Sequence, residues 1–137
     1  MLIESDPLIP LERVQRVLDE HGSSTAVLLL SGVQYLTGQF LDIESITKYA
    51  HDKGVLVIWD LAHAVGNVVL KLHEWNVDIA VWCSYKYLNA GPGTIGGAFV
   101  HEKHAKIDAA ANINGYRPRL AGWWGQSAKK RFNMEQG

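Results

Sequence analysis

The sequence predicts an α/β fold in which a mostly parallel sheet is flanked by helices. Short apolar runs alternate with segments of helical periodicity, and glycine follows several of these segments. Strands that alternate with helices usually pair in parallel, and parallel strands buried on both faces form continuous apolar runs. The 137 residues are enough for one hydrophobic core.

Two helices are predicted in the first half of the chain. The first is indicated by apolar residues at helical spacing, namely Leu11, Val14, Val17 and Leu18. Gly22 ends this helix. The second begins after Asp42, a suitable N-cap with Ser45 three residues on, and it ends at Gly54. A third, short helix is expected near residues 68–75.

Four strands are expected, at residues 26–30, 55–59, 79–83 and 95–100. Ser31 and Asp60 directly follow the first two strands, and Lys86 follows the third. In open α/β sheets, ligands bind beyond the carboxyl ends of the strands. Polar residues of three different types at these positions therefore predict a binding site at this edge of the sheet.

The composition is that of an ordinary globular protein, with 47% hydrophobic residues, 20% charged residues and a net charge of -1. A net charge so close to zero does not indicate binding to nucleic acid or to an anionic membrane. Cys83 is the only cysteine, so no intrachain disulfide can form, which fits a reducing compartment. The longest apolar run is far too short to span a membrane, and no signal peptide is visible. We expect a cytoplasmic protein.

Lys86 and Asp60 together indicate pyridoxal 5'-phosphate (PLP) chemistry. A PLP enzyme needs a lysine that forms a Schiff base and an acid that holds the pyridinium nitrogen. We expect burial and nearby positive charge to lower the pKa of Lys86. Alternatively, Lys86 is a surface lysine and Asp60 a turn or N-cap residue. Their positions after two successive strands favour the PLP site.

Other side chains are candidates for the same site. His63 follows Asp60 by three residues and can stack near the cofactor ring or bond to Asp60, or it is a core histidine. The hydroxyl groups of Ser31 and Tyr85 can donate to a phosphate, or they belong to turns and packing. Trp123 stands in a Gly-Trp-Trp-Gly segment and can cover the cofactor, line a subunit contact or pack loosely.

Two further patterns carry little functional weight. The glycines of residues 91–97 match neither the dinucleotide fingerprint nor the Walker A loop, so nucleotide binding is not indicated. His101 and His104 are spaced by three residues, but no second group of ligands accompanies them. We therefore predict no metal site.

Five segments of the chain resemble kynureninase sequences: GVQYLTGQ at 32–39, DLAHAVGN at 60–67, CSYKYLNAGPG at 83–93, FVHEKH at 99–104 and GWWG at 122–125. The resemblance runs from about Thr25 to Phe132. The second and third segments are specific to kynureninases. Related aminotransferase-like and desulfurase families share the Asp-x-x-His and lysine layout, but they do not share these sequences. Kynureninases are fold-type I, PLP-dependent hydrolases of tryptophan catabolism and de novo NAD biosynthesis.

The resemblance implies a role for each matching residue. Lys86 would be the Schiff-base lysine and the base that removes the α-proton of the substrate. Asp60 would hold the pyridinium nitrogen, with His63 beside it. The remaining cofactor-binding residues would be Ser31, Tyr85 and Trp123. The implied reaction hydrolyses L-kynurenine or 3-hydroxykynurenine to L-alanine and anthranilate or 3-hydroxyanthranilate. The family is dimeric, and each site borrows residues from both subunits.

The chain departs from the family in length. Residues 1–137 resemble a single partial large, cofactor-binding domain, without the upstream cofactor loop and the C-terminal small domain. None of Arg117, Arg119 and Arg131 takes the place of the arginine that binds the substrate carboxylate. We therefore expect the isolated chain to be a catalytically incompetent fragment that acts at most as a PLP-binding or interaction module. A third reading is another fold-type I enzyme, such as a cysteine desulfurase, although Cys83 looks structural.

Overall fold

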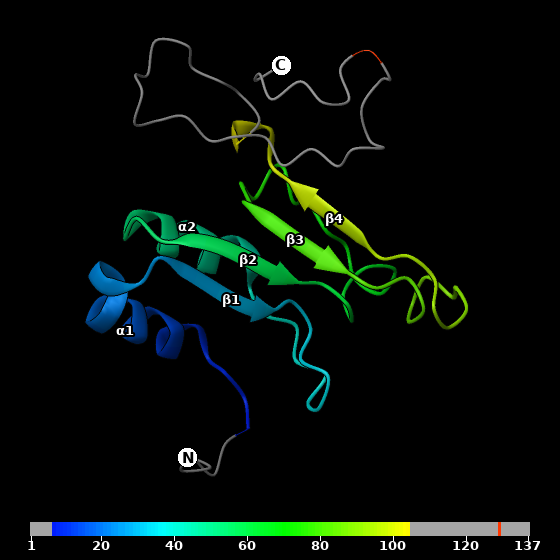
Figure 1. Cartoon of the computed structure of the whole chain (residues 1–137). Coiled ribbons are helices and arrows are strands. Elements are labelled where there is room, and N and C mark those ends of the chain that lie inside the picture. The colour runs from blue at the N-terminus through cyan, green and yellow to red at the C-terminus, as the bar shows by residue number, and fades with distance from the viewer. Residues whose placement is uncertain (1–6, 105–128, 130–137) are drawn as a thin grey trace. The chain divides into compact units, whose positions relative to one another are not determined.

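The computed structural model describes residues 7–104 and 129 (Figure 1). The elements are α1 (Leu11–His21), β1 (Val27–Ser31), α2 (Ile43–Asp52), β2 (Leu56–Asp60), β3 (Ile79–Trp82) and β4 (Gly97–Val100), with short 3-10 turns η1 (Gly22–Ser24) and η2 (Glu102–His104). They all belong to one compact unit, Met1–Ala105. Within the described part of the chain, neither helix is long and apolar enough to cross a membrane.

The four strands form one sheet in the order β1-β2-β3-β4. The first three strands pair in parallel, whereas β4 runs antiparallel to β3. Figure 1 shows the arrows of β1, β2 and β3 pointing the same way, with β4 reversed. The prediction of a mostly parallel α/β sheet is confirmed. Because these three strands are parallel, the loops after β1, β2 and β3 all leave the sheet at the same edge, the one formed by the carboxyl ends of the strands.

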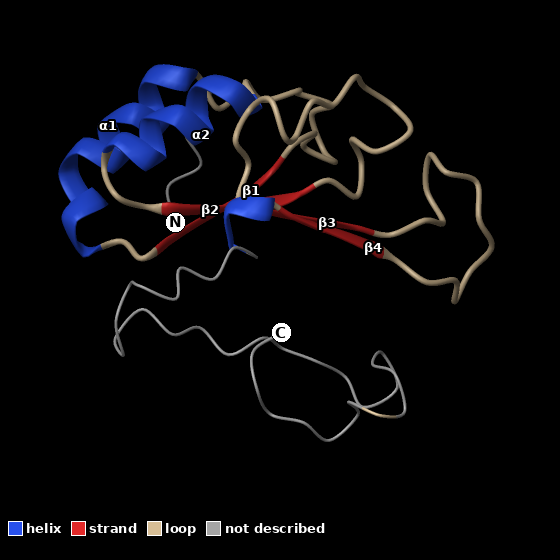
Figure 2. Ribbon diagram, turned by 90° about the horizontal axis from the view of Figure 1, so that it is seen from above, coloured by secondary structure: helices blue, strands red, loops and turns tan. Residues whose placement is uncertain are grey.

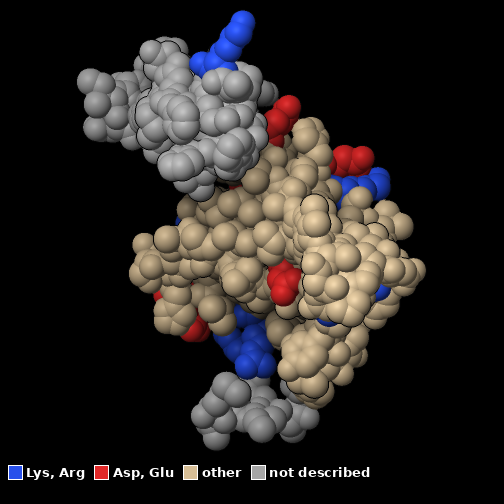
Figure 3. All heavy atoms as spheres, turned by 45° about the vertical axis from the view of Figure 1, so that its right-hand side comes forward, with Lys and Arg blue, Asp and Glu red and all other residues tan. Residues whose placement is uncertain are grey.

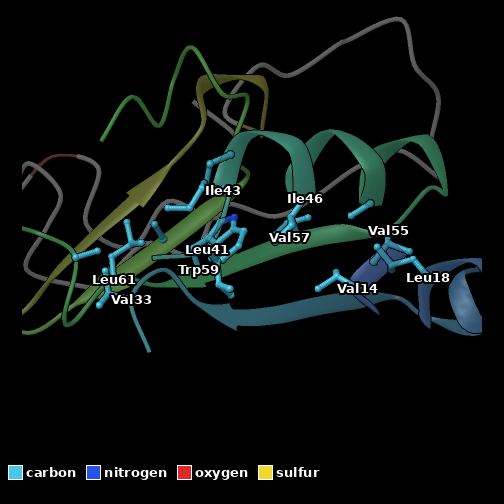
Figure 4. Close-up of a cluster of buried hydrophobic side chains, with 14 residues drawn as sticks. Val14, Leu18, Val33, Leu41, Ile43, Ile46, Val55, Val57, Trp59 and Leu61 are labelled. Carbon is cyan, nitrogen blue, oxygen red and sulfur yellow. The ribbon is translucent and has the colours of Figure 1, made fainter. Parts of the chain in front are cut away.

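Both helices lie on the same side of the sheet (Figure 2). Between them and the strands is the core, in which Val57 and Trp59 of β2 face Ile43 and Ile46 of α2, all at most 1% exposed (Figure 4). Each such aliphatic side chain contributes about 1.5–3 kcal/mol by its burial. The helices thus cover one face of the sheet and fix the positions of its strands.

The predicted start of α2 is confirmed. The Asp42 carboxylate accepts a hydrogen bond from the backbone N–H of Ser45 at 3.0 Å, which satisfies one of the free donors at a helix N-terminus. At the other end, Gly54 adopts a φ of 75°, and its N–H donates to the carbonyl of His51. A left-handed residue of this kind is a common helix terminator.

The second face of the sheet carries exposed apolar side chains. Leu29 of β1 is 62% exposed, and Val27, Val81 and Val100 are also exposed. The sequence predicted that the first strand is buried on both faces, and for β1 this is wrong. The reason is that α1 and α2 both pack on the opposite face. Ser31 and Asp60 lie on the exposed face, because they alternate with the partly buried Leu30 and the buried Trp59 side chains.

The short helix expected at residues 68–75 is also wrong. The segment between β2 and β3 forms two separate turns, one closed by Val68 N–H to Ala64 and one by Val77 N–H to Leu72. Gly66 and Asn76 have φ values of 80° and 55°, which interrupt a right-handed helix. The last strand starts at Gly97, two residues later than predicted.

A buried carboxylate joins the elements at the start of β3. Asp78 is 3% exposed and lies 2.6 Å from His51 Nε2, 2.6 Å from Lys103 Nζ and 2.8 Å from His104 Nε2. It also accepts a hydrogen bond from Val57 N–H at 2.8 Å. Burial alone would raise the pKa of Asp78, but the bonds from Lys103, His51 and Val57 outweigh it and hold the pKa far below its usual range. Asp78 therefore ties α2, β2 and η2 together.

Candidate cofactor-binding site

The structure brings Ser31 and Asp60 side by side. They are the last residues of β1 and β2 and are paired in the sheet register, and Asp60 is paired in turn with Val81 of β3. Lys86 lies in the loop that follows β3. All three residues therefore lie at or beyond the same edge of the sheet, as the sequence predicted. No hydrogen bond joins any two of them in the described part of the chain.

Asp60 forms a turn and still has a carboxylate oxygen to offer. Its Oδ1 accepts a hydrogen bond from Ala62 N–H at 2.9 Å, so the turn reading of this residue is correct in part. The side chain is exposed, and no other described residue bonds to it. A carboxylate with an available acceptor is what a protonated pyridine nitrogen requires.

Lys86 is held by two neighbours in its own loop. Its Nζ lies 3.2 Å from Cys83 Sγ and 4.8 Å from the centre of the Tyr85 ring. The hydrogen bond with Cys83 raises the pKa of Lys86, which is opposite to the lowering that the sequence analysis expected. The reason is that the nearest ionisable group is a thiol, not a second cation. Partial burial raises the pKa of the Cys83 thiol, but the bonds with Lys86 and Tyr85 outweigh it and lower that pKa.

The loop that carries Lys86 is closed by its own hydrogen bonds. Ala90 N–H donates to the Ser84 carbonyl and Asn89 N–H to the Lys86 carbonyl, both at 3.0 Å. The Ser84 hydroxyl bonds to the Ile95 carbonyl at 2.5 Å and lies 2.9 Å from the hydroxyl of Thr94. Sequence reasoning missed Ser84, although a hydroxyl residue two positions before the lysine was a signal. Its bonds fix both ends of the loop.

The loops after β2 and β3 approach each other at Gly66. A Cβ atom on Gly66 would lie 2.8 Å from the Tyr87 carbonyl oxygen, closer than real Cβ atoms come. This close approach brings the His63 and Tyr87 rings to 6.2 Å. His63 also lies 6.3 Å from the ring of Tyr35, a residue that sequence reasoning did not select. Both distances lie within the usual range of aromatic pairs, and His63 is therefore a half-exposed ring between two tyrosines.

The surface around these loops is mostly apolar. Exposed side chains here are Tyr35, Leu36, Val69, Tyr85 and Ile95. Figure 3 brings forward the side of the molecule on which β1, β2 and β3 end, and charged side chains are sparse on its described surface. Exposed apolar surfaces of this kind are typical of ligand and protein contacts.

Trp123 lies outside the described residues, as do Arg117, Arg119 and Arg131. His104 bonds to Asp78 and belongs to the buried network at the opposite edge. Residues 7–104 hold no group of three or more histidine, cysteine or acidic side chains suited to a metal ion.

The described residues fit PLP by their chemistry. Lys86 supplies an amine that can condense with an aldehyde, and Asp60 supplies an available carboxylate oxygen. Tyr85 is 52% exposed and carries a hydroxyl group, which is a donor that a phosphate can accept.

Curated relatives of this chain are kynureninases. The chain is 58% identical over 132 residues to "Kynureninase 1" of Aspergillus oryzae, covering 94% of this chain and 27% of that protein. It is 55% identical over 130 residues to "Kynureninase" of Coccidioides immitis, covering 95% and 27%. It is 54% identical over 134 residues to "Kynureninase 2" of Emericella nidulans, covering 96% and 28%. The chain therefore spans about a quarter of the length of these relatives.

Solved structures share the fold. An alanine–glyoxylate aminotransferase from Nostoc sp. matches with a TM-score of 0.60 and 27% identity, over 85% of this chain and 29% of that one. A ureidoglycine-glyoxylate aminotransferase from Bacillus subtilis matches with a TM-score of 0.63 and 19% identity, over 72% and 24%. A cysteine desulfurase from Thermococcus onnurineus matches at 0.61 and 20%, over 75% and 25%. At identities of 19% and 20%, the last two show the fold alone.

The model of the family "Aminotransferase class-V" matches residues 3–116, which is most of the chain. Enzymes of this family depend on PLP, and their large domain has the fold-type I architecture. The match agrees with the parallel β1-β2-β3 order and with the loop that carries Lys86. The chain belongs to the class-V aminotransferase family.

Proposed function

We propose that this chain is part of the large, cofactor-binding domain of a kynureninase. The whole enzyme would hydrolyse L-kynurenine or 3-hydroxykynurenine to L-alanine and anthranilate or 3-hydroxyanthranilate. The observation that carries this proposal is the parallel pairing of β2 with β3, because it brings the loops of Asp60 and Lys86 to one edge. The similarity to kynureninases of three fungi supports the choice of substrate.

Each residue of the site has a proposed task. Lys86 Nζ holds the cofactor and then takes the proton from Cα of the substrate. The available oxygen of Asp60 accepts a hydrogen bond from the pyridine nitrogen and keeps it protonated. When bound, PLP supplies an electron sink for the bond-breaking step. The hydroxyl groups of Ser31 and Tyr85, with the Trp123 indole, are proposed to contact the phosphate.

His63 is proposed to lie against the cofactor near Asp60. Its ring lies between those of Tyr35 and Tyr87, so its orientation is restricted by aromatic contacts from two other loops. A flat ring held in this way suits a stacking role.

We also propose the wider context that the kynureninase similarity suggests. The protein would act in tryptophan catabolism and de novo NAD biosynthesis in the cytoplasm, as a homodimer that takes small-molecule substrates and binds neither nucleic acid nor membrane. Residues 1–137 would form one partial large domain. In isolation the chain would bind PLP without turning over kynurenine.

A cysteine desulfurase is the competing activity. It would need a cysteine that moves to the substrate, but Cys83 lies three residues before the cofactor lysine and 3.2 Å from its amine. The likeness to a desulfurase structure at 20% identity extends to the fold only. We therefore favour the hydrolase.

The proposal is tested by grafting. The 132 matching residues of the Aspergillus oryzae "Kynureninase 1" are replaced by those of this chain, and anthranilate release from kynurenine is followed by fluorescence. We expect the chimera to be active and its Lys86→Ala variant to lose at least about 100-fold, the usual contribution of a proton-transferring group. A folded chimera that loads PLP without releasing anthranilate would contradict the proposal. Sulfide release from cysteine by the same chimera would favour the desulfurase instead.

A further inference from the structure

We propose that Cys83 is a positioning residue for Lys86, whose thiol holds the lysine amine beyond the end of β3 until the cofactor takes that amine. The inference rests on the proposed function of Lys86 as the cofactor lysine. It assigns a task to Cys83, the only cysteine of the chain, which sequence reasoning regarded as structural.

The amine of Lys86 contacts the thiol of Cys83. Cys83 is the first residue after β3, so the sheet fixes its backbone, and its side chain is half-buried. Lys86 Nζ lies 3.2 Å from Cys83 Sγ, within hydrogen-bond range for sulfur. Two hydrogen bonds close the turn that contains Lys86, from Ala90 N–H to the Ser84 carbonyl and from Asn89 N–H to the Lys86 carbonyl. A long, flexible side chain is thus held at its tip by a short one on a fixed backbone.

The partner of the Lys86 amine is a thiol and not a carboxylate. In the described part of the chain, no ion pair joins a carboxylate to the Lys86 amine, which bonds to the Cys83 thiol and lies over the face of the Tyr85 ring. A carboxylate would keep the lysine charged over the whole physiological range. A thiol can itself take the proton, because its own ionisation lies closer to neutrality. Cys83 therefore restrains the amine with a group that can also accept its proton.

Cys83 and Lys86 influence each other's ionisation across this contact. The Cys83 hydrogen bond raises the pKa of Lys86, and Tyr85 acts in the same direction. Burial raises the pKa of Cys83, but Lys86 and Tyr85 together lower it. Removing either member of the pair should then change the ionisation of the other, which a purely structural role for Cys83 would not do.

The first test needs no cofactor. The rate of Cys83 alkylation by iodoacetamide is measured at neutral pH in the 137-residue chain, in Lys86→Met and in the control Lys71→Met. Lys71 is a suitable control because its amine pairs with Glu74 at 3.0 Å, three residues away on the surface. We expect Lys86→Met to slow alkylation several-fold, because the thiolate is the reactive form, and Lys71→Met to leave the rate unchanged. Equal rates in all three proteins would overturn the inference.

The second test uses PLP as the probe. The visible absorbance of lysine-bound PLP is recorded against pH for the unmodified chain, Cys83→Ala and Cys83→Ser, with circular dichroism as the check on folding. We expect the pH midpoint of PLP capture to move downward in both variants, because neither side chain forms the anion that stabilises the charged amine. An unchanged midpoint in both variants would overturn the inference, even where PLP still binds.

The two tests separate this inference from the proposed function. If Lys86→Ala captures PLP as well as the unmodified chain does, the proposed function fails, while the alkylation rates still decide whether the thiol and the amine are coupled. If PLP capture requires Lys86 but the Cys83 variants change nothing, the proposed function stands and the positioning role is wrong.

Discussion

The indole of Trp59 donates a hydrogen bond to the hydroxyl of Thr47 at 3.0 Å, and both residues are 0% exposed. Trp59 directly precedes Asp60 on β2, and Thr47 lies on α2. The bond therefore fixes the helix against the strand that ends in the proposed cofactor carboxylate. Neither partner can turn to water if the other is removed.

We predict that Thr47→Val destabilises the chain by about 1–3 kcal/mol, the cost of leaving a buried donor without an acceptor. Valine keeps the shape of threonine, so the loss reports the hydrogen bond and not a cavity. Urea unfolding followed by tryptophan fluorescence measures it. Thr47→Ser retains the hydroxyl and should lose less, and equal losses in the two variants would contradict this account.

We predict that the free energy of unfolding falls at acidic pH because of Asp78. Its pKa is depressed in the folded chain, whereas an unfolded aspartate titrates near about 3.9. The stabilisation is therefore complete above about pH 5 and is lost as pH falls through the unfolded value toward the folded one. Asp78→Asn should cost about 3–5 kcal/mol near neutral pH, because it leaves the Lys103 amine without its buried counter-charge.

The unfolding free energy of Asp78→Asn should also depend less on pH between about 5 and 2 than that of the unmodified chain. The matched control is Asp52→Asn, which removes an exposed carboxylate of α2 that pairs with Lys48 at 2.9 Å. Surface pairs contribute about 0–1 kcal/mol, so this variant should change little. Parallel pH profiles for Asp78→Asn and the unmodified chain would disprove the role given to Asp78.

Gly66→Ala should disturb the lysine loop more than its backbone strain explains. Gly66 and Gly38 have φ values of 80° and 70°, so alanine at either position is strained, by about 1–3 kcal/mol. Only at Gly66 would the new methyl group meet a neighbour, the Tyr87 carbonyl at 2.8 Å, whereas nothing lies within 4 Å at Gly38. PLP capture should therefore weaken in Gly66→Ala and stay near normal in Gly38→Ala. Equal capture by the two variants would show that the approach of the loops is unimportant.

Ser84→Ala should loosen the lysine loop while the core stays intact. The Ser84 hydroxyl bonds to the Ile95 carbonyl across the loop, and both groups are exposed enough to find water. We expect a change of about 0.5–1.5 kcal/mol or less in unfolding free energy, but faster proteolytic cleavage within residues 84–96. Ser24→Ala removes a similar hydrogen bond, from the Ser24 hydroxyl to the His21 carbonyl. This control variant should leave the rate of cleavage within residues 84–96 unchanged.

Sequence patterns within a short segment correctly predicted the helices and strands of that segment. Prediction failed for features that depend on contacts between segments far apart in the sequence. Helix α2 followed from its apolar spacing, its Asp42 cap and its Gly54 end, all of which lie within residues 42–54. The antiparallel direction of β4 has no such signal, because it depends on the path of the loop before it. The exposed face of β1 depends on where both helices pack, which its apolar run does not specify.

The residues of the candidate site were also only partly predictable from the sequence. The sequence selected Asp60 and Lys86 because strand ends and residue types are visible in it. It missed Tyr35, since that ring reaches His63 only through the turn that pairs Val33 with Phe40. It also gave the wrong direction for the pKa of Lys86, because that direction depends on a side-chain contact with Cys83.

Strand β3 begins immediately after the buried Asp78 network and ends immediately before the loop that carries Lys86. Its four residues span on the order of 13 Å. At that separation, substitutions at the two ends should have additive effects on stability. The stability of the Asp78 end and the sequence of the Lys86 loop could then be varied independently on one strand, and the best variants of each could be combined.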